Sequence, residues 1–202
     1  MSATRRVLCL CGSLRRVSSN RAALEAAQRL ARPGDAPSLR REPQAGGPGP
    51  AARGARPALE LHLYDGLAAL PPFNPDDEHD PLPAPVLALR EAVGRADALL
   101  VACPEYAHGV PGAFKNLLDW LVGSLEFPGK PVLLLDTSAR GAHHGQAALA
   151  EILRTMSATL LGARPFPVAL PGAGCTAEQV LASAERRAEL RAALDRLAEG
   201  LA

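Results

Sequence analysis

The sequence predicts one α/β domain whose mostly parallel sheet is covered by helices on both faces. Apolar strands alternate with amphipathic helices along the chain, which is typical of parallel α/β folds. Two of the strands, 96–103 and 131–136, are continuous apolar runs, as expected for strands that are covered on both faces. The chain has 202 residues, of which 48% are hydrophobic and 21% charged, so it is long enough for one such core.

Each element follows from a local pattern of apolar spacing and of residues that end helices or strands. The expected elements, in chain order, are a strand at 7–11, a helix from 21 to about 30–32, a half-covered or edge strand at 58–64, a helix at 86–95, a strand at 96–103, a helix at 113–125, a strand at 131–136, a helix at 146–160, a short strand near 166–170 and a helix at 176–197.

Two connections are expected to be irregular. Residues 33–57 are rich in Pro, Gly and Arg and carry no periodic apolar face, so they are predicted to form a surface insertion. Residues 65–85 are rich in proline and include an acidic run at 76–80.

The residues of this acidic run are consecutive, and His143 and His144 are adjacent with no third ligand at a suitable spacing. We therefore expect no metal site.

Overall charge excludes several classes of partner. The formal net charge is +1 and no long basic run is present, so nothing favours nucleic acid or an anionic membrane. No apolar segment approaches the roughly 20 residues that span a bilayer, and residues 1–6 lead directly into the first strand. These observations predict a cytoplasmic protein.

The four cysteines show no paired CxxC spacing and no zinc signature: Cys9, Cys11, Cys103 and Cys175. Cys9 and Cys11 alternate along the first strand and should be small buried hydrophobes. Cys11 and Cys103 each end an apolar run, so neighbouring strands would bring the two thiols together. A redox pair is the alternative to two inert buried thiols.

An anion site is expected where the first strand ends. The apolar run stops at Gly12, and the next loop carries short neutral donors and a guanidinium: Ser13, Ser18, Ser19, Asn20 and Arg15. The helix that follows would direct free N–H groups and the positive end of its dipole at this loop, which favours an anion by about 0.3–1 kcal/mol per contact. The spacing matches neither GxxxxGK[ST] nor GxGxxG, which excludes a P-loop and a dinucleotide fingerprint. Many separate donors suit a phosphate monoester, whereas helix capping by Ser18 or Ser19 accounts for one hydroxyl only.

Loops with special composition follow three of the strands, and the carboxyl ends of parallel strands lie at one edge of a sheet. The second loop offers Tyr106 to a planar ring, and the third offers Ser138, Arg140 and backbone amides to a polar ring edge. A phosphate at one end and a flat heterocycle at the other predict a ligand the size of a mononucleotide.

The residues of these loops resemble a known family. Gly12–Asn20, Pro104–Tyr106 and Val110–Trp120 are similar to motifs of the NADPH-dependent FMN reductases, which include quinone, azo-dye and chromate reductases. The resemblance spans about residues 5–160. It implies a flavodoxin-like, three-layer, doubly wound sandwich with a five-stranded parallel sheet in the order 2-1-3-4-5. The chain, residues 1–202, would be a single FMN-binding domain that holds FMN noncovalently and forms a homodimer or homotetramer, with the helix at 114–125 as the expected interface.

By position, the resemblance assigns three parts of FMN to the three loops. The phosphate is assigned to Ser13, Arg15, Ser18, Ser19 and Asn20. The isoalloxazine ring is assigned to Pro104, Glu105, Tyr106, Ala107, His108 and Gly109. The pyrimidine side is assigned to Ser138, Ala139, Arg140 and Gly141. The chain departs from the family at Ala107, where an Asn is common, and at 141–145, where a run of glycines is usual.

The resemblance also implies a reaction. NADPH or NADH would give hydride to FMN and leave, and a quinone, azo compound, metal oxyanion or flavin would then accept the electrons at the same face. No catalytic protein nucleophile is needed, and His108 is the expected contact to the substrate. Two alternatives remain: a flavin-binding electron carrier or redox sensor, and a serine hydrolase with Ser13 as nucleophile and His143 as base. Near-neutral charge disfavours an acidic carrier, and the GxSxG elbow of hydrolases is absent.

Overall fold

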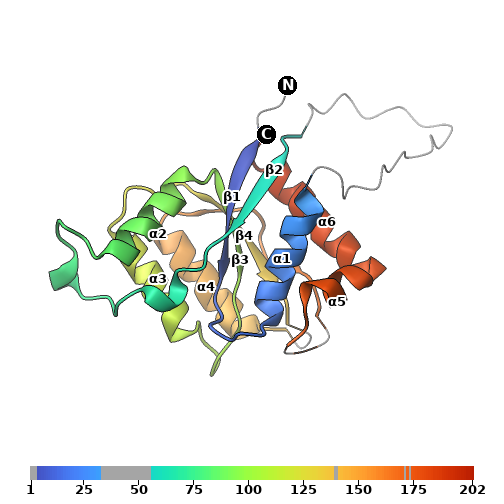
Figure 1. Cartoon of the computed structure of the whole chain (residues 1–202), viewed down its shortest axis with the longest axis horizontal. Helices are drawn as coiled ribbons and strands as arrows, with labels where there is room; N and C mark the ends of the chain where they lie inside the picture. Colours follow the sequence, from blue (N-terminus) through green and yellow to red (C-terminus); the bar gives the residue numbers. More distant parts are fainter. Residues whose placement is uncertain (1–3, 33–55, 139–140, 171, 173) are drawn as a thin grey trace.

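The computed structural model describes residues 4–32, 56–138, 141–170, 172 and 174–202. Within these residues a parallel sheet runs through the centre of the molecule in the order β2-β1-β3-β4-β5, and β6 also pairs with β4 (Figure 1). Its strands are β1 (Arg5–Cys11), β2 (Leu59–Leu63), β3 (Ala98–Ala102), β4 (Pro131–Asp136), β5 (Thr159–Leu160) and β6 (Phe166–Pro167). The predicted strand order is confirmed.

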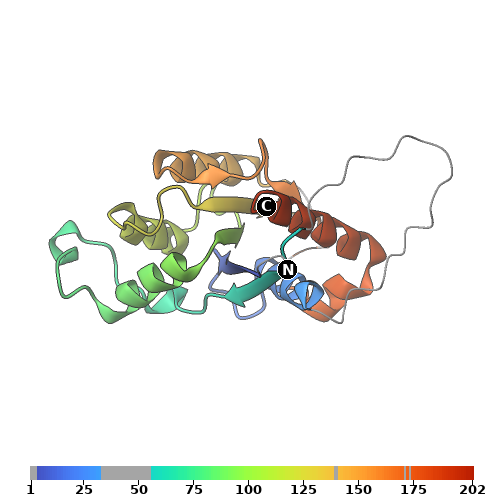
Figure 2. The same cartoon turned by 90° about the horizontal axis from the view of Figure 1, so that it is seen from above.

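Helices cover both faces of the sheet (Figure 2). They are α1 (Ser19–Ala31), α2 (Ala84–Arg95), α3 (Gly112–Val122), α4 (His143–Thr155), α5 (Ala177–Ala182) and α6 (Ala184–Glu199), with two short 3-10 helices, η1 (Leu67–Ala69) and η2 (Pro75–Asp77). One apolar core joins the sheet to α1, α5 and α6, and a second joins it to α2, α3 and α4. The three-layer sandwich is therefore the observed architecture, and among the described helices none is both long and apolar enough to cross a bilayer.

Alternation along β1 supplies both cores from one strand. Val7 and Cys9 pack toward α1, whereas Leu8 and Leu10 pack toward α2 and α3, because successive side chains of a strand point to opposite faces. All of β3 is buried, as the continuous apolar run predicted. β2 lies at the edge of the path, which confirms the edge-strand prediction. Most of the predicted insertion, residues 33–55, lies outside the described residues.

The fifth strand position differs from the prediction. It is divided between β5, which pairs with the start of β4, and β6, which pairs with its end. The preceding helix stops at Thr155 instead of Leu160, because Ser157 adopts a left-handed conformation (φ 66°). The N–H of Ser157 donates to Arg154 O and that of Ala158 to Leu153 O, which is a Schellman motif without its usual glycine.

Two further boundaries were wrong. α4 begins at His143, three residues earlier than predicted, so both adjacent histidines lie in its first turn. The predicted helix at 176–197 is broken at Ser183, whose extended backbone ends α5 and whose hydroxyl accepts the Arg186 N–H at the start of α6. A serine that caps the second helix thus replaces one long helix by two.

The connection between β2 and α2 is fastened to α3. The side chain of Asn116 accepts the N–H of Phe73 at 2.7 Å and donates to Pro71 O at 2.9 Å. The indole N–H of Trp120 donates to the same carbonyl at 2.8 Å. Trp120 is fully buried, so it belongs to the core.

Candidate functional site

The loops that follow β1, β3 and β4 line one cavity of about 530 Å³ at the carboxyl edge of the sheet. Ligands of open α/β sheets bind at this edge, and the volume lies in the usual range for small-molecule sites. Predicted residues that line it are Ser13, Arg15, Ser18, Ser19, Asn20, Pro104, Glu105, Tyr106, Ser138 and Gly141. Residues that line it without having been predicted are Cys103, Thr137, Ala142 and Gly172. The remaining predicted residues are Ala107, His108 and Gly109, which do not line it, and Ala139 and Arg140, which lie outside the described residues.

Gly12 brings the first two loops into contact. Its N–H donates to Ala102 O at 2.9 Å. A Cβ at Gly12 would overlap the sulfur of Cys103 and lie 3.0 Å from its Cβ and 3.1 Å from its Cα. The backbone of one loop therefore lies against the other at a distance that only glycine allows.

The N-terminus of α1 faces the cavity. Ser18 is its N-cap, with an extended backbone (φ −128°) and a hydroxyl that accepts the Arg21 N–H at 3.5 Å. Ser18 thus has the capping role that was the alternative for this hydroxyl, and it lines the cavity as well. The first N–H groups of a helix have no partner within the helix, so this end provides backbone donors and a positive dipole.

Ser19 is occupied by another segment of the chain. Its hydroxyl donates to Gly172 O and accepts the Gly174 N–H at 3.1 Å. The segment after β6 is therefore joined to the first loop. The hydroxyl proton of Ser19 points to a carbonyl, so in this arrangement it is not directed at a ligand.

Asn20 is held from the third loop. Asn20 and Thr137 are both buried, and the hydroxyl of Thr137 donates to Oδ1 of Asn20 at 2.9 Å. Both residues line the cavity.

The arginines of the first loop have different surroundings. Arg15 lines the cavity, and its N–H donates to the hydroxyl oxygen of Ser13 at 3.3 Å. Arg21 instead forms ion pairs with Glu25 at 2.8 Å and with Asp65 at 2.6 Å. Arg15 is therefore the cationic side chain of this loop that borders the cavity.

The second loop ends in a tight turn. Tyr106 and Gly109 exchange two backbone hydrogen bonds of 3.0 and 2.9 Å, and the residues between them have positive φ, 48° at Ala107 and 60° at His108. This is the pattern of a type I′ turn, for which Asn and Gly are preferred. The Asn that the resemblance leads us to expect at position 107 would therefore suit the backbone of this turn, besides any hydrogen bond to a ligand. Tyr106, half exposed, is the side chain of this turn that lines the cavity.

Glu105 joins the second loop to α4. Its carboxylate accepts the N–H of Gly145 at 2.6 Å. The N-cap of α4 is Ala142, which has no side chain able to accept this bond. Glu105 therefore does from a distant loop what a capping serine or aspartate does locally.

Replacing Glu105 by alanine should lower the free energy of unfolding by about 1 kcal/mol, because the first turn of α4 loses its acceptor. Glu105→Gln keeps an acceptor oxygen and should lose less than half as much. Urea denaturation followed by circular dichroism measures both. An equal loss in the two variants would show that the charge matters and the acceptor does not.

The third loop is bonded to the end of β4, and the first turn of α4 brings one histidine to the second loop. The N–H of Ser138 donates to the carboxylate of Asp136 at 3.0 Å. His144 stacks on His108 with ring centroids 4.4 Å apart and planes inclined by 27°. The stack was not predicted, because it joins the second loop to the first turn of α4, which are distant in sequence. Among the described residues no group of three His, Cys, Asp or Glu side chains is arranged to hold a metal ion.

A family model described as NADPH-dependent FMN reductase matches residues 5–170. The chain belongs to this family. The three loops that line the cavity all lie within the matched residues.

Characterised relatives carry related names. A quinone reductase of Escherichia coli is 34% identical over 115 residues, which are 54% of this chain and 61% of that protein. An NAD(P)H-dependent FMN reductase of Pseudomonas aeruginosa is 34% identical over 141 residues, or 69% of this chain and 63% of that protein. An NADPH azoreductase of a Bacillus species is 37% identical over 115 residues, or 56% and 63% of the two chains. The matched region therefore spans a little over three fifths of the length of each relative.

Solved structures share the whole fold. FerB, a flavoenzyme NAD(P)H:(acceptor) oxidoreductase from Paracoccus denitrificans, has a TM-score of 0.66 at 25% identity, and the match covers 96% of this chain and 98% of that one. An NAD(P)H:quinone oxidoreductase from Methanothermobacter marburgensis has a TM-score of 0.53 at 17% identity, covering 95% and 93%. The second likeness shows the fold alone.

In this FMN reductase family member the cysteines near the cavity are protonated thiols. Burial raises the pKa of Cys103 to about 12 and also raises the pKa of Cys11. Thiolate is the nucleophile in disulfide exchange, so little reactive form is present near neutral pH. These values favour the inert role for both residues over the redox pair.

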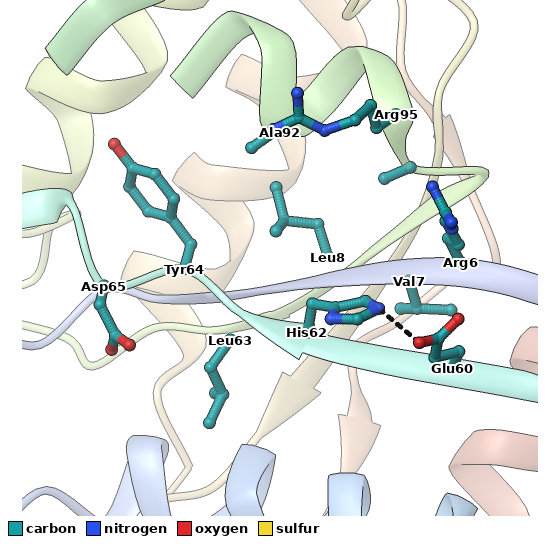
Figure 3. A pocket seen from close by; sticks show the side chains of 11 residues that line it. Arg6, Val7, Leu8, Glu60, His62, Leu63, Tyr64, Asp65, Ala92 and Arg95 are labelled. Carbon is teal, nitrogen blue, oxygen red and sulfur yellow. Dashed lines mark ion pairs between the residues drawn. The ribbon is translucent and has the colours of Figure 1, made fainter. Parts of the chain in front are cut away.

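A second hollow of about 440 Å³ lies between the edge strand β2 and α2 (Figure 3). Leu8 lies at its floor, and Arg95 lies beside it on the last turn of α2. His62 projects from β2 next to Glu60, 3.2 Å away, and is half exposed. The dipole at the end of α2 disfavours an anion here, whereas Arg6 and Arg95 favour one, so this hollow does not repeat the helix N-terminus that borders the first cavity.

Proposed function

We propose that the protein is an FMN-dependent oxidoreductase that oxidises NADPH or NADH and reduces a small-molecule acceptor, namely a quinone, an azo compound, a metal oxyanion or a flavin. The observation that carries the proposal is the convergence of three loops on one cavity with a helix N-terminus at its border. The names of the relatives, which include quinone, azo and FMN reductases, support the same reaction class.

The residues present fit FMN in size and in chemistry. The cavity of about 530 Å³ is bordered by Arg15, Asn20 and the start of α1, which together suit a phosphate dianion. Tyr106 offers an aromatic surface, and Ser138 adds a polar group on the third loop. Bound FMN would accept a hydride from the nicotinamide and pass electrons to the acceptor.

The chain's own groups bind and orient in this mechanism. Arg15 and the α1 amides would hold the phosphate, and Tyr106 would lie against the ring system. Two backbone hydrogen bonds between Tyr106 and Gly109 close the turn, and they thereby fix the backbone that carries Tyr106. No nucleophilic side chain is required of the residues that line the cavity.

The two alternatives receive less support. A serine nucleophile needs a base within hydrogen-bond reach. The hydroxyl oxygen of Ser13 accepts the Arg15 N–H, and among the described residues no imidazole is hydrogen-bonded to Ser13. An electron carrier or redox sensor would use the same cavity but would not turn over with NADPH.

A flavin assay separates the three functions. The purified protein should be yellow or become so with added FMN, and NADPH or NADH should bleach it until a quinone restores the colour. FMN binding without bleaching by either nucleotide would indicate a carrier or sensor. Ester hydrolysis by protein that binds no FMN would indicate a hydrolase and contradict the proposal.

His108 is proposed to contact the substrate, since it lies at the tip of the second loop and stacks on His144. His108→Ala should change KM for the acceptor by about threefold to tenfold while the Kd of FMN stays within about twofold. The control variant is His79→Ala. His79 is exposed and lies in the connection between β2 and α2. Unchanged kinetics with several acceptors would remove His108 from the assignment.

Assembly and location complete the proposal. Exposed apolar side chains at and after the end of α3, Val122 (63% exposed) and Leu125 (93%), support a homodimer or homotetramer through this helix. Light scattering should give a mass of two or four chains, and a mass of one chain would contradict it. The four unpaired cysteines, all in the described part of the chain, support a reducing compartment such as the cytoplasm.

A further inference from the structure

We propose that Thr137 is a positioning residue for the cofactor phosphate: its hydroxyl orients the amide of Asn20 so that the NH₂ group faces the cavity. The proposal rests on the proposed function, because it takes FMN as the ligand. Thr137 itself need not touch the phosphate.

The contact joins two loops that are distant in sequence. Asn20 lies in the first turn of α1, and Thr137 follows directly after β4. The two side chains are buried, each 8% exposed, and the Thr137 hydroxyl lies 2.9 Å from Oδ1 of Asn20. Since both residues also line the cavity, the bond lies at the wall of the proposed site.

The chemistry of an amide gives this bond its consequence. A primary amide has an acceptor oxygen at one end and a donor nitrogen at the other, whereas phosphate oxygens only accept. An Asn20 side chain turned by 180° would present its oxygen to the anion and repel it. While the Thr137 hydroxyl donates to Oδ1, the NH₂ end of Asn20 stays free for the ligand; in the turned amide the NH₂ would donate to Thr137 and the oxygen would face the anion.

The neighbouring hydroxyls do not fill this role. Ser18 caps α1, and Ser19 is bonded to Gly172 and Gly174. Among the described residues the amide nitrogen of Asn20 forms no hydrogen bond, so its two N–H groups remain available to a ligand. Its orientation matters more for that reason.

The test compares the affinity for FMN with that for riboflavin, which lacks the phosphate. Flavin fluorescence quenching gives both dissociation constants for the wild type, Thr137→Val, Thr137→Ser, Asn20→Ala and the double variant Thr137→Val/Asn20→Ala. Thr137→Val is nearly isosteric but has no hydroxyl, and thermal unfolding of each variant confirms that it is folded.

Thr137→Val should weaken FMN binding about tenfold and leave riboflavin binding within about twofold. Thr137→Ser keeps the hydroxyl and should bind FMN like the wild type. If Thr137 acts through Asn20, Thr137→Val should cause no further loss of FMN affinity in the Asn20→Ala variant.

Several results would overturn the inference. Equal losses for FMN and riboflavin would show that Thr137 serves the fold or the ring, and additive losses in the double variant would show that it acts independently of Asn20. Wild-type affinity for FMN in Thr137→Val or in Asn20→Ala would also contradict the positioning role of Thr137. A wild-type protein that binds neither flavin would instead reject the proposed function, and the positioning role with it.

Discussion

Replacing Gly12 by alanine should reduce the affinity for FMN at least about a hundredfold and lower the free energy of unfolding by about 1–3 kcal/mol. The new methyl group would overlap the sulfur of Cys103 and press on its backbone, with Cα only 3.1 Å away. Backbone cannot move aside as the end of a flexible side chain can. The first loop would therefore shift from β3, and the α1 amides would leave their place at the cavity. FMN titration and urea denaturation measure the two effects.

Gly112 provides a matched control. It is the first residue of α3, and a Cβ added there meets no atom within 4 Å. Gly112→Ala should therefore leave both quantities unchanged or raise stability slightly. Adding Cys103→Ala to Gly12→Ala should restore only part of the loss, because the sulfur is removed but the methyl carbon and the backbone of the second loop still lie too close. Normal FMN binding by Gly12→Ala would contradict the role of this close approach.

Trp120→Ala should lower the free energy of unfolding by about 3–5 kcal/mol, the largest stability change that we expect from one side chain. Trp120 is completely buried, donates to Pro71 O at 2.8 Å, and meets Phe73 edge-on with ring centroids 5.0 Å apart. Arg90 also donates to the main-chain carbonyl of Trp120, at 3.1 and 3.0 Å, and the alanine variant keeps this contact. Against a typical total of about 5–15 kcal/mol, this loss removes a large fraction of the stability.

The measurement needs circular dichroism, because Trp120 is the single tryptophan and its loss removes the fluorescence signal. Trp120→Phe keeps most of the apolar contact but loses the bond to Pro71, so it should cost less than half as much. Because Trp120 is not among the residues that line the cavity, FMN affinity of folded Trp120→Ala should stay within a few fold. A loss of stability below about 1 kcal/mol would argue against a core role.

Patterns within single elements predicted most of the fold. Continuous apolar runs marked β3 and β4, alternation marked β2 as an edge strand, and three loops with polar and small residues indicated the site edge. The helix boundaries that the patterns missed lack the residue types that usually mark a helix end, or have a capping serine within a helical pattern. Ser157 ends α4 in a left-handed conformation that is unusual for serine, so no glycine announced the end.

In the candidate site, what the patterns missed was set by contacts between distant segments. Residue types predicted which loops meet, but not the partner of each side chain. Glu105 bonds Gly145, forty positions away, and Ser19 bonds Gly172, 153 positions away. Thr137 was missed, although as the first residue after β4 it lay at a position where polar side chains line such cavities. That position is the signal that would have found it.

The cross-connections among the loops have a thermodynamic consequence. Hydrogen bonds join the first loop to β3, the first loop to the third, the second loop to the start of α4, and the first loop to the segment after β6. The walls of the cavity are thus fixed to one another by the protein alone. A ligand that enters a preorganised cavity restricts few additional torsions, so less of its interaction free energy is spent on ordering the chain. We therefore expect the protein to release and regain its flavin without refolding.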